Sequence, residues 1–225
     1  MTAPKPFSHR TLLWALVLLL FPVLVSAQGV ITYLEGSVTI VRAGTSLVAD
    51  IGSDVQERDT ITTGPRATAV IRLAGAADIK LRENSSVDLS TIGNSVNVDL
   101  NRGGVFARVF GQILGGFAVV ADTVVGGVRG TEFFVAYGRT IEDLPDVWLC
   151  VNSGEVEVTV VPTEATMPVR EGEGVNILAG MRLTDARRYR WTERLNWNMD
   201  PAAGPVFDET DLDGAYADLL NQDYD

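Results

Sequence analysis

Short runs in which apolar and polar residues alternate fill the chain from residue 30 to about residue 178. In the clearest run, Glu155–Val160, the valines at 156, 158 and 160 share one face, and Glu155, Glu157 and Thr159 share the other. A period of two is typical of half-buried β-strands. Gly, Asn, Asp and Pro separate the runs, and no helical period is visible before Thr184. The sequence predicts an all-β fold with many short strands, in either a solenoid-like or a roll or sandwich arrangement.

The N-terminus has the composition of a secretory signal. Lys5 and Arg10 precede an apolar stretch of about 14 residues, and Val25, Ser26 and Ala27 offer small residues for cleavage. We expect residues 1–27 to be a signal peptide, and the mature chain to lie in the periplasm or outside the cell with no membrane span. An uncleaved N-terminal anchor is the alternative.

Charge and residue usage exclude several functions. The net charge of −11 becomes −13 when residues 1–27 are removed, which argues against nucleic acid as a partner. The single cysteine, Cys150, allows no intramolecular disulfide, and its apolar surroundings predict a buried, inert thiol. The single histidine, His9, lies in the signal peptide. The mature chain therefore lacks Ser-His-Asp and Cys-His catalysis and the common zinc sites, and we expect no cofactor or metal.

The most distinctive stretch is residues 126–135, where three glycines and an arginine lead directly into an alternating strand. This order predicts a turn that feeds a strand, since a phosphate-binding loop would lead into a helix. We expect Arg129 to be at least partly buried against carbonyls or an acid, and Gly130 to adopt a conformation that other residues adopt poorly.

Six blocks of sequence resemble the FecR domain in the family's order. They are residues 34–38, 59–73, 79–85, 100–105, 128–133 and 151–156. The most specific block consists of Val128, Arg129, Gly130, Thr131, Glu132 and Phe133. The resemblance implies an exported all-β domain, here over residues 28–181, without known catalytic residues. We expect the six motif residues to be structural rather than binding.

The best-known FecR proteins are regulators of iron-siderophore signalling, which carry a cytoplasmic anti-sigma domain before a transmembrane helix. Only ten residues precede the apolar stretch here, so we expect no anti-sigma domain. The resemblance therefore implies a non-catalytic exported module, possessing a binding or scaffolding role in the cell envelope and a possible link to signalling. Its partner would be an envelope protein or glycan, and its oligomeric state is open.

Beyond the domain, residues 182–199 have the pattern of a helix with Thr184 as its N-cap. Arginines and tryptophans on it could dock a partner, and the candidates are Arg188, Trp191 and Trp197; packing against the end of the domain is the alternative. Residues 200–225 contain eight acids and no Lys or Arg, which predicts a flexible acidic tail.

Two further patterns in the sequence are weak. Glu209, Asp211, Asp213 and Gly214 match part of a calcium loop, but Leu220 stands where its bidentate carboxylate is required, so we expect no calcium site. Glu155 and Glu157 would lie about 7 Å apart on one strand face, near the spacing of glycosidase carboxylates. A polysaccharide-active enzyme is therefore the alternative function, although an exposed strand face produces such pairs routinely.

Overall fold

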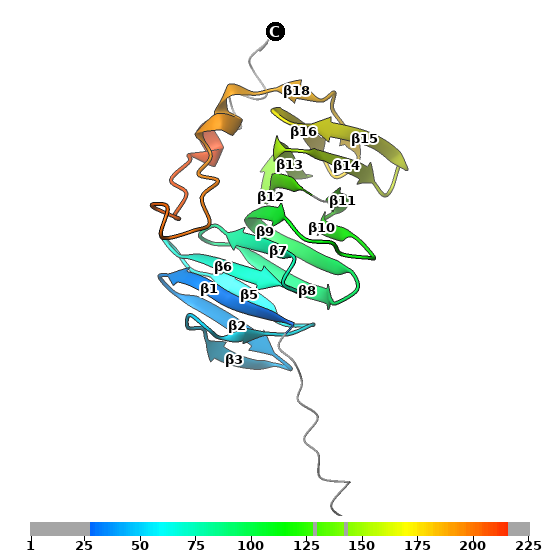
Figure 1. Ribbon diagram of the computed structural model, residues 1–225. Coiled ribbons are helices and arrows are strands. Elements are labelled where there is room, and N and C mark those ends of the chain that lie inside the picture. The colour runs from blue at the N-terminus through cyan, green and yellow to red at the C-terminus, as the bar shows by residue number, and fades with distance from the viewer. Residues whose placement is uncertain (1–27, 128–129, 142–143, 216–225) are drawn as a thin grey trace, which may run out of the picture.

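The computed structural model describes residues 28–127, 130–141 and 144–215 (Figure 1). Residues 1–27, which include the expected signal peptide and His9, lie outside the described residues, as do Val128, Arg129 and residues 216–225. No helix among the described residues is long and apolar enough to cross a membrane. The strands are β1 (Gly29–Glu35), β2 (Val38–Arg42), β3 (Thr45–Val48), β4 (Asp54–Val55), β5 (Thr60–Thr63), β6 (Thr68–Leu73), β7 (Ala77–Leu81), β8 (Ser86–Ile92), β9 (Val96–Val109), β10 (Phe117–Ala121), β11 (Thr123–Gly127), β12 (Thr131–Ile141), β13 (Leu144–Ser153), β14 (Glu155–Val160), β15 (Ala165–Arg170), β16 (Glu173–Leu178), β17 (Arg182–Leu183) and β18 (Arg187–Arg188).

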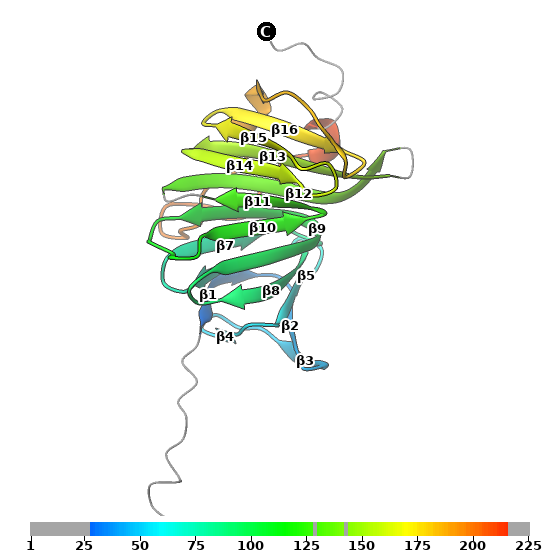
Figure 2. The same ribbon diagram turned by 90° about the vertical axis from the view of Figure 1, so that its right-hand side faces the viewer.

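The strands form two sheets that rise from β3 at one end to β15 and β16 at the other (Figure 2). Sheet A has the order β4-β1-β6-β7-β9-β12-β13-β16, with β17 and β18 both on β16. Sheet B has the order β3-β2-β5-β8-β9-β10-β11-β14-β15. Every pair is antiparallel except β9–β10. The all-β prediction is confirmed, and the antiparallel pairing favours the roll or sandwich over the solenoid.

Strand β9 belongs to both sheets. Its first half pairs with β8 and β10 in sheet B, and its second half pairs with β7 and β12 in sheet A. Gly103 lies at the change of sheet with a φ of +87°, and a Cβ there would come within 2.3 Å of the Ser85 hydroxyl oxygen. Only glycine fits this position without movement of its neighbours. The adjacent Gly104 N–H donates to the same hydroxyl at 2.9 Å.

Alternation along the strands fills the space between the sheets. On β14, Val156, Val158 and Val160 are fully buried in the main core, while Glu155 and Glu157 are exposed. On β7, Ile79 and Leu81 point into the same core. Each such side chain contributes about 1.5–3 kcal/mol of burial free energy, so the alternating pattern fixes which face of each strand points inward.

The outer face of sheet A carries a second apolar layer. A chain of aromatic contacts runs from Phe106 to Phe134 (4.5 Å between ring centroids) and on to Trp148 (5.6 Å). Cys150 lies in this layer, and burial raises the pKa of its thiol, as expected for an inert cysteine. Four residues from the C-terminal part of the chain cover the layer: Tyr189, Leu195, Met199 and Val206. Sheet A is therefore buried on both faces.

The C-terminal part differs from its expected form. Residues 182–199 do not form one helix: Arg187 and Arg188 pair with β16 in β18, and only Arg190–Arg194 form a short 3₁₀ helix. The Thr184 hydroxyl accepts the Asn176 N–H at 2.9 Å instead of capping a helix. Pairing with the edge of β16 satisfies more backbone groups than a short isolated helix would.

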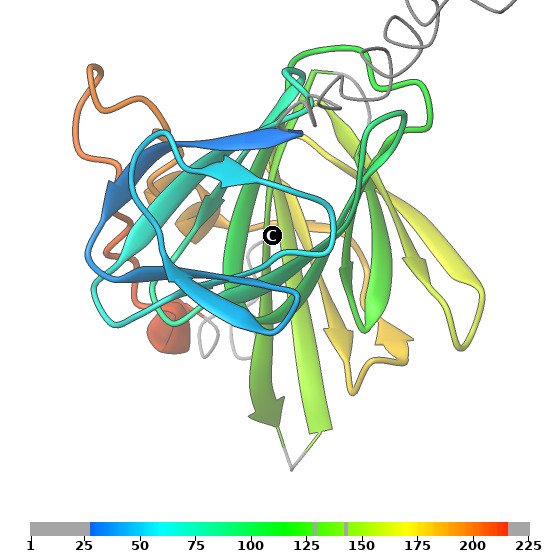
Figure 3. The same ribbon diagram turned by 90° about the horizontal axis from the view of Figure 1, so that it is seen from below.

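Residues 195–213, here called the strap, continue from that helix and run along the outer face of sheet A (Figures 1 and 3). Val206 and Asp208 in the strap are buried, at 1% and 4% exposure. We expected residues 200–225 to form a flexible acidic tail, whereas the structure places residues 206–212 against the domain. One acid of this segment, Asp208, pairs with a cation on the outer face of sheet A.

Candidate partner-binding face

Three basic side chains project from the outer face of sheet A toward the strap. Strand alternation dictates their direction: Ile79 and Leu81 enter the core, so Lys80 and Arg82 point outward, and Arg108 on β9 does the same beside inward Ala107. Lys80 is fully buried, and it is the single lysine after residue 27. Buried cations require partners, and the strap supplies them.

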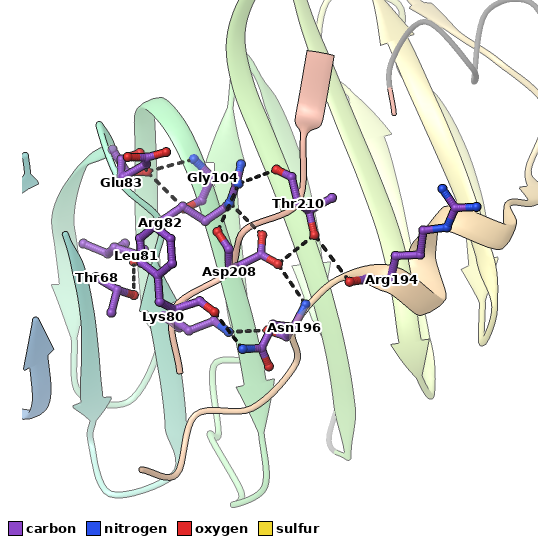
Figure 4. A network of polar contacts seen from close by, with 12 residues as sticks. Thr68, Lys80, Leu81, Arg82, Glu83, Gly104, Arg194, Asn196, Asp208 and Thr210 are labelled. Carbon is purple, nitrogen blue, oxygen red and sulfur yellow. Dashed lines mark hydrogen bonds and ion pairs between the residues drawn. The ribbon is translucent and has the colours of Figure 1, made fainter. Parts of the chain in front are cut away.

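Lys80 is held by backbone carbonyls of the strap (Figure 4). Its ammonium donates to the carbonyl oxygens of Asn196, Asn198 (3.0 Å) and Val206 (3.2 Å), and it lies 4.1 Å from the centre of the Phe106 ring. Burial lowers the pKa of Lys80 from 10.5 to about 8, although the nearby carboxylate of Asp208 acts in the opposite direction. The ammonium thus remains the main form at neutral pH, in a site that stabilises it with three acceptors and a ring face.

Arg82 on the outer face of sheet A forms an ion pair with Asp208 of the strap (Figure 4). The Arg82 Nε and the Asp208 Oδ2 are 2.8 Å apart, and the side chains are only 9% and 1% exposed. Arg82 also donates to the carbonyl oxygen of Thr210 at 2.7 Å. The other carboxylate oxygen of Asp208 accepts the Asn196 N–H at 2.9 Å and the Thr210 hydroxyl at 2.8 Å. Removing one partner of such a buried pair is strongly destabilising.

Arg108 links the strap to the sequence motif. Its Nε donates to Glu132 at 2.7 Å, and its Nη2 donates to the carbonyl oxygen of Trp197 at 3.1 Å. The Asn152 amide donates to the second carboxylate oxygen of Glu132. Glu132 is 8% exposed, so it is a buried ion-pair partner between β9, β12 and β13.

The other described motif residues lie in the turn before β12 and in β12 itself. Gly130 has a φ of +78°, in agreement with its expected unusual conformation. The Thr131 hydroxyl lies 3.4 Å from the carbonyl oxygen of Glu155, and Phe133 packs edge-on against Phe117 in the main core. The expected burial of Arg129 falls on a residue outside the described ranges.

The three expected docking residues have different surroundings. Arg188 is exposed, and its backbone pairs with Glu173. The Trp197 ring packs edge-on against Phe106 at 5.2 Å, and its N–H donates to the carbonyl oxygen of Thr192 at 3.1 Å. Trp197 therefore packs against the domain, which was the alternative for this segment. The side chain of Trp191 lies outside the described part of the structure.

The carboxylates of the alternative function are exposed on sheet B. Glu155 lies 3.1 Å from Arg170 in an ion pair that is more than half exposed, and Glu157 lies opposite Pro168. Across the described ranges, no group of three or more His, Cys, Asp or Glu side chains is placed to hold a metal ion. In the partial calcium-loop pattern, a carboxylate oxygen of Asp211 accepts the Asp213 N–H at 3.1 Å.

Sequence reasoning missed the roles of Lys80, Arg82 and Arg108. The available signal was the alternation Ile79-Lys80-Leu81-Arg82, which places two cations on the face opposite the core. Half-buried antiparallel strands usually have one solvated face, so this pattern alone does not indicate that a later segment covers the two cations.

Hollows remain beside the strap. One, of about 690 Å³, is lined by Arg194, Asn196 and residues between 205 and 215. A second, of about 300 Å³, lies between Arg82, Glu83 and strap residues 208–213. The strap therefore leaves open space along one border of the face.

Comparisons with known proteins agree with the fold and the motif. The sequence profile described as FecR protein matches residues 59–161, which contain five of the six blocks. No curated protein sequence matches the chain.

Two crystal structures of a protein from Parabacteroides distasonis ATCC 8503, described as a candidate anti-sigma factor, are similar in structure. The structure at 2.50 Å has 17% identity and a TM-score of 0.50, over 61% of this chain and 67% of that one. The structure at 1.65 Å has 17% identity and a TM-score of 0.49, over 57% of this chain and 59% of that one. This chain thus spans less than two thirds of the latter protein. At this identity, the 2.50 Å structure supports a shared fold alone.

Proposed function

We propose that this chain, whose residues 59–161 match the FecR protein profile, is a non-catalytic module of the cell envelope that binds a protein partner in signalling. It acts in the periplasm or outside the cell after residues 1–27 are removed. The FecR match supports the signalling role, and the composition of residues 1–27 supports the export.

The observation that carries the proposal is the chemistry of the outer face of sheet A. Lys80, Arg82 and Arg108 all donate to carbonyl oxygens of one polypeptide segment, the strap, and an aromatic layer lies beneath them. Carbonyls in this arrangement belong to a protein chain, so the face is suited to a protein rather than to a sugar. The candidate catalytic carboxylates lie elsewhere, exposed on sheet B, and Glu155 is already paired with Arg170.

Crosslinking in the native cell tests this function. The full chain with a C-terminal affinity tag is produced in its own host, crosslinked with formaldehyde and purified from the envelope fraction. We expect the mature protein to begin at Gln28 and to carry a protein adduct. Recovery only in the cytoplasm would contradict the export, and recovery of glycan adducts alone would contradict the protein partner.

A further inference from the structure

We propose that the outer face of sheet A is a peptide-binding face, occupied here by the chain's own strap, and that an acidic segment of the partner protein, folded back on itself as the strap is, competes for it. The identity of the partner as a protein rests on the proposed function. The displacement of the strap from the face by another peptide does not depend on the proposed function, and a separate experiment tests it.

The first argument is the kind of contact that the face makes. Lys80, Arg82 and Arg108 reach the strap mainly through its backbone carbonyls, at residues 196, 198, 206, 208, 210 and 197. Every residue has a carbonyl, so these contacts recognise the backbone of a polypeptide without demanding a particular sequence. The contacted carbonyls lie on two arms of the strap, residues 196–198 and 206–210, which the Asn196 side chain joins through hydrogen bonds to Pro205 and Phe207. Among the described residues, Arg82 with Asp208 is the one ion pair between the face and the strap. The face therefore requires a polypeptide that carries one well-placed carboxylate.

The second argument is charge and apolar spacing. The chain has a net charge of −11, yet the outer face of sheet A carries Arg72, Lys80, Arg82 and Arg108 against Asp78, Asp146 and Glu132; Asp78 pairs with Arg72, and Glu132 pairs with Arg108. The strap contributes Asp208, and Val206, two residues before that carboxylate, contributes a buried apolar side chain. An occupant with an apolar residue followed two positions later by Asp or Glu has the matching chemistry.

The third argument is how the strap is attached. Among the described residues, no backbone-to-backbone hydrogen bond joins the strap to a strand of sheet A. The strap instead braces itself: the Asn196 amide donates to the carbonyls of Pro205 (2.9 Å) and Phe207 (2.8 Å), and the Asn198 amide donates to Gly204 (3.0 Å). The β-ladders of the two sheets therefore do not include the strap, and its displacement would break none of them.

The acylation rate of Lys80 shows whether the strap covers the outer face of sheet A. This residue is the single lysine after residue 27 and is fully buried under the strap, so an amine-acylating reagent reaches it only when the face is open. The test uses the full mature chain, with N-hydroxysuccinimidyl acetate as reagent and peptide mapping by mass spectrometry to separate Lys80 from the N-terminal amine. Asp208→Ala removes the buried carboxylate of the strap, and Glu209→Ala, at an exposed neighbouring position, is the matched control.

We expect Lys80 to be acylated at least about a hundredfold faster in Asp208→Ala than in the wild type. Glu209→Ala should react at the wild-type rate. An N-acetylated synthetic peptide of residues 195–213, which contains no lysine, should restore protection to Asp208→Ala, and the same peptide with the Asp208→Ala change should not. Equal protection by both peptides, or by neither, would overturn the proposal.

Two further outcomes are decisive. If Asp208→Ala does not fold, as judged by circular dichroism, the wild type is cleaved at a protease site inserted at the exposed residues 201–203. Exchange of the C-terminal fragment for labelled peptide of residues 204–213 supports the proposal, and retention of the fragment until global unfolding refutes it. If light scattering instead finds Asp208→Ala as a dimer, the occupant is a second copy and the partner segment is refuted.

The two proposals fail in distinguishable ways. If the peptide protects Lys80 but crosslinking in cells yields no protein adduct with any variant, the proposed function fails and the peptide-binding face stands. Alternatively, a partner is crosslinked equally to the wild type, Asp208→Ala and Glu209→Ala while the peptide does not protect Lys80. In that case the partner binds elsewhere, and the proposal of a peptide-binding face is refuted.

Discussion

The buried ammonium of Lys80 makes a sharp prediction about how stability depends on pH. Burial lowers the pKa of Lys80 in the folded protein to about 8, whereas in the unfolded chain it has its ordinary value of 10.5. Between these two values the unfolded state binds more protons than the folded state. The free energy of unfolding therefore rises with pH across this window, because the folded protein no longer has to bury a charge.

The expected size follows from the shift. From pH 7 to pH 10, Lys80 should raise the free energy of unfolding by about 2–3 kcal/mol. Other groups oppose this: burial raises the pKa of Cys150, and also those of Tyr33, Tyr137 and Tyr189, so these groups lower stability at alkaline pH. The Lys80→Met variant keeps an apolar chain of similar length against Phe106 and cannot titrate. The difference between wild type and variant isolates the lysine.

The assay is urea unfolding at pH 7 and pH 10, followed by tryptophan fluorescence, for the wild type and Lys80→Met. The stability of the wild type relative to the variant should increase by the stated amount between the two pH values. Parallel pH profiles for the two proteins would show that Lys80 is not buried as a cation under the strap, and would refute the reasoning.

Three further predictions concern other parts of the structure. Asp208→Ala should lower the free energy of unfolding by about 3–5 kcal/mol because it leaves Arg82 unpaired under the strap, whereas Glu209→Ala should change it by less than about 0.5 kcal/mol; urea titration measures both. Gly103→Ala should cost at least about 2 kcal/mol, because its Cβ would meet the Ser85 hydroxyl at a backbone angle that favours glycine, and a thermal midpoint equal to that of the wild type would contradict this. Purified mature chain should release no product from envelope polysaccharides, and product release abolished by Glu157→Gln would support the enzymatic alternative instead.

Local pattern was enough to predict the strand content and the main core. The alternation in Glu155–Val160 placed Val156, Val158 and Val160 inward, and all three are fully buried. The FecR resemblance found the motif that leads into β12. These features depend on neighbours in sequence, because one strand's pattern reveals its buried face before its pairing partners are known.

The strap could not be predicted in the same way. Its contacts join residues more than 100 positions apart, such as Lys80 with Asn198 and Arg82 with Thr210. Acidic composition alone favours a flexible tail, and nothing local in residues 195–213 indicates that carbonyls and one carboxylate meet buried cations. The helix prediction failed for a similar reason, since the free edge of β16 determined the conformation of Arg187 and Arg188.

Site-specific crosslinking from the face itself tests the central claim most directly. A photoreactive amino acid replaces Glu83, which lines the hollows beside the strap, in the full chain produced in its native cells. The control position is Val161, which is 55% exposed beyond the end of β14. We predict a protein adduct at position 83 that becomes stronger when Asp208→Ala is added, with little adduct at position 161. Adducts at position 161 with none at position 83, whether or not the strap is weakened, would contradict a protein-binding face on sheet A.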